Sequence, residues 1–252
     1  MMRLGVLTPS SNTVLEPLSA AIVAGLPDVT VHFSRFRVTE IALTPGALAQ
    51  FDEAAVLQAA GLLADARVDV IAWSGTSASW LGFAADQALC RRIQAATGVP
   101  ATTSILALNH ALAATGVRRL GLVTPYRDDV QARIVANYAA LGISCVAERH
   151  LGLQDNFSFA EVDAAGLDRM VRDVAAARPD AIAVLCTNLR AAALVAGWEA
   201  ELQTPVYDTV ATAVWGGLGL AGVDAAAVTG WGRLFRLPPP QGGANDAARD
   251  RR

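Results

Sequence analysis

The chain has 252 residues, of which 53% are hydrophobic and 17% charged, and its formal net charge is -3. This composition can bury a large core, which excludes an intrinsically disordered protein and fits one large domain or two small ones. This small negative net charge gives no sign of the basic surface that binding to a nucleic acid or an anionic membrane normally requires. We therefore expect neither among its partners.

The three cysteines, Cys90, Cys145 and Cys186, are widely spaced and odd in number. They form no CxxC pair and have no histidine at metal-ligand spacing, so we expect reduced thiols and no metal site. The N-terminus enters an apolar strand without a signal-peptide pattern, and no apolar run is long enough to span a bilayer. We therefore expect a soluble cytoplasmic protein, and the sequence allows a homo-oligomer without specifying one.

The pattern of the N-terminal segment predicts a strand over residues 4–7 and a helix over 14–24. A polar turn that contains Ser10 and Asn12 joins them. Small hydroxyl residues at a helix N-terminus favour anions, although an ordinary loop explains the same pattern equally well. An alternating strand over 29–38 and a helix over 51–66 follow.

A second polar loop follows the predicted strand at 68–73. Here Ser74, Gly75, Thr76 and Ser77 place three hydroxyl groups around one glycine, so several hydrogen-bond donors can be directed into a small space. Such a loop can also serve only to cap the next helix, which we expect over 84–96. Cys90 lies within that helix, where a cysteine usually packs as a small hydrophobic residue.

In the second part of the chain, a strand at 120–123 leads into a loop that contains Tyr126, a donor of longer reach than a serine. A helix at 130–141, a strand at 144–148, a loop with Asn156 and a helix at 160–177 follow. The apolar strand 181–185 then ends on Cys186 and Thr187. Open α/β sheets bind ligands at the carboxyl ends of their strands, so Cys186 is the strongest candidate for a site residue.

The remaining predicted elements are a helix over 189–201, a short strand over 205–207 and a helix over 210–220. The polar, Pro/Gly-rich segment 237–252 is expected to be a disordered tail.

An internal duplication relates the two halves of the chain. Residues 68–79 align with 179–190, residues 3–10 with 119–126, and residues 99–103 with 204–208, so that Gly75 occupies the position equivalent to Cys186. We expect one α/β half over 1–105 and a second over 106–209, with 210–236 packing back on the first. Two such halves place equivalent strand ends around one shared cleft.

These motifs resemble the aspartate/glutamate racemase superfamily, and within it the arylmalonate decarboxylases and maleate cis-trans isomerases. The resemblance covers about residues 3–235 and rests on Pro-Ser-Ser-Asn at 9–12, Gly-Thr-Ser at 75–77, Thr-Pro-Tyr-Arg-Asp-Asp at 124–129 and Cys186. It implies two pseudo-symmetric Rossmann-like (flavodoxin-like) halves, each a parallel sheet flanked by helices, with the active site between them. It also implies no metal or organic cofactor and a small carboxylate or dicarboxylate substrate.

The resemblance further implies roles for individual residues. Racemases of this superfamily carry a cysteine at each of the two equivalent strand ends, whereas this chain has Gly75 at the first and Cys186 at the second. A single second cysteine beside a Gly-Thr-Ser loop resembles the decarboxylases. In that case Thr76, Ser77 and Tyr126 would hold one carboxylate, the other would leave as carbon dioxide, and Cys186 would protonate the enediolate from one face.

Other residues depart from the decarboxylase pattern. The chain has Cys186-Thr187-Asn188 where these decarboxylases have Cys-Gly-Gly. Asn12 and Asn156 resemble residues that bind substrate carboxylates in the isomerases, and Ser10 is a further candidate contact. The backbone N–H groups of Cys186 and Thr187 are expected to add donors to the carboxylate site.

Three hypotheses follow from the sequence. The first is a cofactor-independent decarboxylase of a substituted malonate or related dicarboxylate. The second is a maleate-type isomerase that acts through Cys186 alone, which the asparagines favour and Gly75 opposes. The third is a non-catalytic carboxylate-binding protein, since one fold hosts several chemistries. A Cys186→Ala variant should retain ligand affinity in the third case and lose turnover in the first two.

Overall fold

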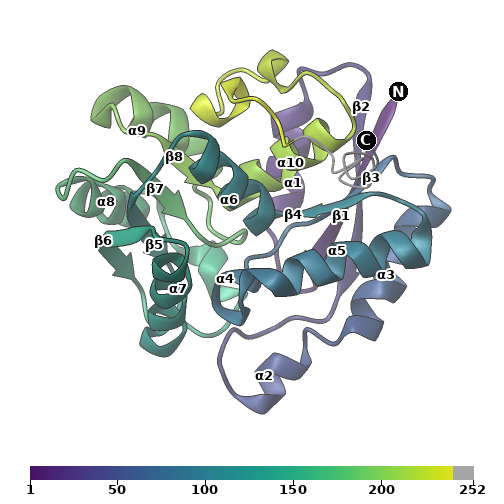
Figure 1. Cartoon of the computed structure of the whole chain (residues 1–252), viewed down its shortest axis with the longest axis horizontal. Coiled ribbons are helices and arrows are strands. Elements are labelled where there is room, and N and C mark those ends of the chain that lie inside the picture. Colours follow the sequence, from purple (N-terminus) through teal and green to yellow (C-terminus); the bar gives the residue numbers. More distant parts are fainter. Residues whose placement is uncertain (241–252) are drawn as a thin grey trace, which may run out of the picture.

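The computed structural model describes residues 1–240, which form two parallel four-stranded sheets. The strand order is β2-β1-β3-β4 in the first sheet and β6-β5-β7-β8 in the second, so both halves have the same flavodoxin-like order. Each sheet is flanked by helices, as Figure 1 shows. The prediction of two pseudo-symmetric α/β halves is confirmed.

The first half contains four strands and the helices that connect them. They are β1 (Met2–Pro9), α1 (Leu15–Val23), β2 (Val29–Phe36), α2 (Pro45–Ala49), α3 (Glu53–Asp65), β3 (Val70–Trp73), α4 (Ala78–Leu81), α5 (Phe83–Thr97), β4 (Ala101–Thr103) and α6 (Ser104–Ala114). The short helices α2 and α4 had no counterpart among the predicted elements. The central strands β1 and β3 carry mostly apolar residues and are buried, as expected for strands covered on both faces.

The second half repeats this arrangement. Its elements are β5 (Arg119–Thr124), α7 (Asp128–Ala140), β6 (Ser144–His150), the 3-10 turn Ser158–Glu161, α8 (Ala164–Ala175), β7 (Ala181–Val184), the 3-10 turn Ala192–Leu194, α9 (Val195–Leu202), β8 (Val206–Asp208) and α10 (Thr209–Leu220). Two further 3-10 turns follow, at Ala225–Ala227 and Arg233–Arg236.

The duplication is visible in individual hydrogen bonds. In the first half, the Asp69 carboxylate accepts a hydrogen bond of 2.7 Å from the backbone N–H of Arg3. In the second half, Asp180 accepts one of 2.8 Å from the backbone N–H of Arg119. Each aspartate thereby ties the start of one strand to the start of its neighbour, so the sequence repeat reflects a repeated contact.

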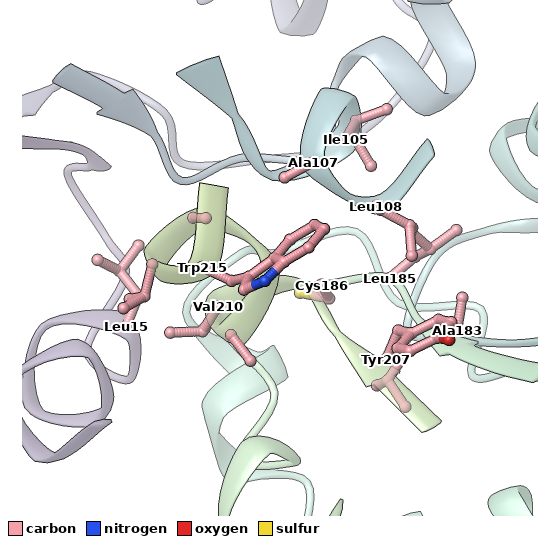
Figure 2. Close-up of a cluster of buried hydrophobic side chains, with 14 of the residues drawn as sticks. Leu15, Ile105, Ala107, Leu108, Ala183, Leu185, Cys186, Tyr207, Val210 and Trp215 are labelled. Carbon is pink, nitrogen blue, oxygen red and sulfur yellow. The ribbon is translucent and has the colours of Figure 1, made fainter. Parts of the chain in front are cut away.

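The two halves share a buried core. Helix α10 packs against α6 and α1, against β3 and β4 of the first sheet and against β8 of the second. Figure 1 shows α6 and α10 between the two sheets. The fully buried Trp215 of α10 belongs to the same apolar cluster as Leu108 of α6 and Cys186 (Figure 2). Because this core spans both halves, the strand ends that face it are held in a fixed relation.

The predicted start of one helix was wrong. The helix expected over 189–201 begins at Val195, and residues before it form turns. The Asn188 side chain holds these turns, because its Oδ1 accepts from the backbone N–H of Thr13 at 3.0 Å and its Nδ2 donates to the Asn156 carbonyl at 2.6 Å. Cys186 therefore precedes a turn and does not lie at a helix N-terminus.

Of the segment expected as a tail, residues 241–252 lie outside the described residues. Before them, Pro239 lies against Gly219 near the end of α10.

Candidate active site

The carboxyl ends of the central strands meet at one small cavity between the halves. Its volume is about 20 Å³, which is room for about one water molecule. The wall includes most of the expected site residues, together with apolar side chains from the first half. The lining residues are Pro9, Val38, Ile41, Phe51, Trp73, Gly75, Thr76, Ser77, Trp80, Tyr126, Asn156, Cys186 and Thr187.

Cys186 follows β7 and is 3% exposed. The backbone N–H of Asn188 donates a hydrogen bond of 3.3 Å to its Sγ. Burial raises the pKa of the Cys186 thiol to about 12, and the N–H of Asn188 and the Tyr126 phenol act in the opposite direction. The group is therefore a protonated thiol near neutral pH, which suits a proton donor.

Thr76 and Tyr126 face each other from opposite halves. The Thr76 Oγ1 and the Tyr126 hydroxyl form a buried hydrogen bond of 2.6 Å. Burial raises the pKa of Tyr126 well above its ordinary value, and the neighbouring Cys186 adds to the increase. The phenol therefore keeps its proton, and the pair retains one hydroxyl hydrogen for an anion, because only one of the two donates to the other.

Aromatic packing fixes the orientation of the Tyr126 ring. The ring lies edge-on to Trp80, with centroids 5.2 Å apart, and edge-on to Phe159 at 5.7 Å. Such contacts favour one ring position, so the hydroxyl group is held in place before a ligand arrives.

Thr187 and Asn12 connect the two halves beside the cavity. The Thr187 Oγ1 donates to the Ser74 carbonyl at 3.2 Å, and Asn12 Nδ2 donates to the Thr187 Oγ1 at 3.2 Å. Asn12 Oδ1 accepts from the backbone N–H groups of Val14 and Leu15, each at 2.9 Å. The amide oxygen of Asn12 is therefore engaged at the start of α1, and its amide nitrogen is engaged by Thr187.

Ser10 and Asn12 lie outside the cavity lining, whereas Asn156 is part of it. The Ser10 Oγ accepts from the Val38 backbone N–H at 3.2 Å, so it holds the segment that follows β2. Asn156 Nδ2 donates to the Ser11 Oγ at 2.8 Å. Of the two asparagines singled out from the sequence, Asn156 is thus the one that lines the cavity.

The apolar lining of the cavity includes Val38, Ile41, Phe51 and Trp80. The first three come from the segment between β2 and α3, which the sequence did not mark as part of a site. Trp73 and Trp80 are both buried and both line the cavity.

Asp208 is a buried carboxyl that sequence reasoning missed. It pairs with Val184 in the β7–β8 register, two residues before Cys186, and its Oδ1 accepts from the N–H groups of Val210 and Ala211 at the start of α10. Its Oδ2 has no hydrogen-bond partner among the described residues. Burial raises the pKa of Asp208 to about 7.

Residues 1–240 contain no group of three or more His, Cys, Asp or Glu side chains placed to hold a metal ion. In the same range, no helix is both long and apolar enough to cross a bilayer.

Three comparisons place this geometry among known proteins. The family model for arylmalonate decarboxylase matches residues 16–235. The arylmalonate decarboxylase of Bordetella bronchiseptica is 38% identical over 170 residues, which cover 66% of this chain and 70% of that protein.

Solved structures share the fold over nearly the whole chain. A mutant maleate isomerase from Pseudomonas putida S16, solved with maleate, has a TM-score of 0.84 at 26% identity and covers 93% of this chain and 97% of its own. A liganded arylmalonate decarboxylase mutant, with one glycine changed to cysteine and one cysteine to serine, has a TM-score of 0.82 at 29% identity. It covers 93% of this chain and 99% of its own.

Proposed function

Because this chain belongs to the arylmalonate decarboxylase family, we propose that it is a cofactor-independent decarboxylase of a substituted malonate or a related small dicarboxylate. The observation that carries the proposal is the single thiol at the cavity. Cys186 lines it, and the equivalent position in the first half is Gly75, which has no ionisable side chain.

One carboxylate of the substrate binds at the polar end of the cavity. Thr76 and Tyr126 supply one hydroxyl hydrogen between them, and the Ser77 hydroxyl lines the same wall. The backbone N–H groups of Cys186 and Thr187 are further donors in this role. When the substrate loses carbon dioxide, negative charge moves onto this carboxylate as an enediolate, and fixed donors aimed at the developing charge lower the barrier.

The second carboxylate faces the apolar wall of Val38, Ile41 and Phe51. A carboxylate without a hydrogen-bond partner is destabilised in such surroundings, whereas neutral carbon dioxide is not. The carbon–carbon bond breaks, its electron pair enters the enediolate, and carbon dioxide leaves.

Cys186 completes the reaction by transferring its proton from Sγ to the carbon that lost carbon dioxide. The resulting thiolate regains a proton from water. Because the Gly75 face offers no acid, the proton arrives from one side, and the product is a single enantiomer.

A maleate-type isomerase is the second candidate. Asn156 lines the cavity and could bind a second retained carboxylate, and the maleate isomerase structure has a TM-score of 0.84. The low acidity of the Cys186 thiol opposes this reaction, because addition to a double bond requires a thiolate. The named relatives are all enzymes, which does not support a purely binding role.

The experiment that tests the proposal is proton NMR of the protein with 2-methyl-substituted malonates and maleate in one sample. Formation of the monoacid by the wild type, and not by Cys186→Ala, is the expected result. Conversion of maleate to fumarate with no decarboxylation would replace the proposal by the isomerase. If every compound stays unchanged, the proposed decarboxylase activity is wrong.

A further inference from the structure

The Trp73 indole covers the Gly75 side of the catalytic cavity. A Cβ atom built on Gly75 would lie 2.0 Å from the indole Cζ2 and 2.3 Å from Cε2. Non-bonded carbon atoms do not approach this closely. With the Trp73 ring in this position, residue 75 therefore has no room for a side chain. The space that a side chain at position 75 would occupy is therefore filled by the ring of Trp73, two residues earlier in the chain.

Trp73 also separates the catalytic cavity from a second one. This neighbour has a volume of about 110 Å³ and lies between β3, α3 and α5. Its wall is mainly apolar and includes Phe36, Val56 and Leu89. Trp73, Phe51 and Ser77 line both cavities.

The indole is held as a fixed wall. Trp73 is 2% exposed, and its ring packs against Phe36 with centroids 4.9 Å apart. Trp73 also pairs with Leu7 and Thr103 in the sheet, so its backbone is fixed on both sides. A buried aromatic ring with neighbours of this kind does not change rotamer without displacing them.

We propose that Trp73 is the residue that determines substituent size, restricting the substrate to a compact, alkyl-sized group on the carbon that loses carbon dioxide. This inference rests on the proposed decarboxylase function and names its substrate class. The indole stands between the cavity beside Gly75 and the neighbouring cavity of about 110 Å³, so a substituent that extends from the reacting carbon toward Gly75 meets the ring. Removal of the indole would join this space to the second cavity and admit an aryl group.

The first test compares two substrates, 2-ethyl-2-methylmalonate and 2-methyl-2-phenylmalonate. The wild type is expected to decarboxylate the ethyl compound with the higher kcat/KM. Trp73→Val should raise the phenyl-to-ethyl ratio of kcat/KM at least about tenfold, as pocket enlargement does elsewhere. Trp215→Phe is the control, because Trp215 is a fully buried tryptophan that lines neither cavity, and it should change the ratio less than about threefold.

An equal preference of the wild type for both substrates, or an unchanged ratio in Trp73→Val, would overturn the inference. If the wild type decarboxylates neither compound, the proposed function fails. The inference is then tested by the Kd values of the product acids, 2-methylbutanoate and 2-phenylpropanoate. Trp73→Val should strengthen binding of the phenyl acid relative to the butanoate at least about tenfold. Failure of every variant to bind either acid would also overturn it.

A second test needs no ligand. Gly75→Ala should lower the Tm of the wild type by roughly 5 °C, because its new methyl group meets the indole. In the Trp73→Val background the same change should have little effect. Trp73→Phe provides a milder background if the valine variant folds poorly. If Gly75→Ala lowers the Tm equally in the wild type, in Trp73→Val and in Trp73→Phe, the ring does not occupy this space.

Discussion

Tyr126→Phe is the change that most specifically removes a donor from the proposed carboxylate site. The variant loses the hydroxyl group that bonds to Thr76 at 2.6 Å but keeps the ring packed against Trp80 and Phe159. Loss of one preorganised donor to a developing oxyanion lowers kcat by about 100- to 1000-fold, or about 3 to 4 kcal/mol. The stability cost should be only about 1 kcal/mol, because a single hydrogen bond is lost.

The assay is steady-state decarboxylation together with urea unfolding of the same preparations. Tyr138→Phe is the matched control, since Tyr138 is also fully buried but its hydroxyl has no partner among the described residues. We expect the control to retain the wild-type kcat and its stability. A Tyr126→Phe enzyme whose kcat stays within about threefold of the wild type would refute the role of this phenol.

Three further predictions concern protonation and the contact between the halves. The decarboxylation rate should not fall between about pH 7 and pH 9.5, because burial raises the pKa of Cys186 to about 12; a loss centred near pH 8.5 would indicate an ordinary thiol. Burial raises the pKa of Asp208 to about 7, so the native state retains a proton that the unfolded state loses near pH 4, and stability declines as pH rises from about 4 to 7. Asp208→Asn should make this decline shallower in urea unfolding at several pH values. Part of the decline should remain, because burial also raises the pKa of Asp86, a carboxyl of α5, to about 7; a decline as steep as in the wild type contradicts the assignment. Asn188→Ala should lower the free energy of unfolding by about 1 to 3 kcal/mol, because it leaves the buried Asn156 carbonyl and the partly buried N–H of Thr13 without their partner, and a loss below about 0.5 kcal/mol would count against that contact.

The sequence contained enough information for the architecture and for the polar end of the cavity. The duplication paired Gly75 with Cys186, and the structure places both on the wall of one cavity, with Thr76 and Tyr126 beside them. This was predictable because equivalent strand ends of two similar halves must converge when the halves share a core.

Other parts depend on packing that no local pattern specifies. Asn12 resembles a carboxylate-binding residue in sequence, yet its amide oxygen caps the start of α1. The turn after Cys186 replaces a predicted helical start because Asn188 bonds across to the first half at Thr13. The Trp73 indole lies over Gly75, but neither residue signals this in the sequence. A tryptophan is ordinary in a strand and a glycine is ordinary in a loop.

The central claim, that Cys186 alone delivers the proton, is tested most directly by decarboxylation of a prochiral 2-alkyl-2-methylmalonate in D2O. The wild type should give one enantiomer with a single deuterium at the new C–H position, and Cys90→Ser, a change at a thiol outside the cavity, should give the same product. Cys186→Ala should lose about 100- to 10,000-fold in rate, and its residual product should be racemic. A Cys186→Ala enzyme that retains both rate and enantiomeric purity would contradict the account.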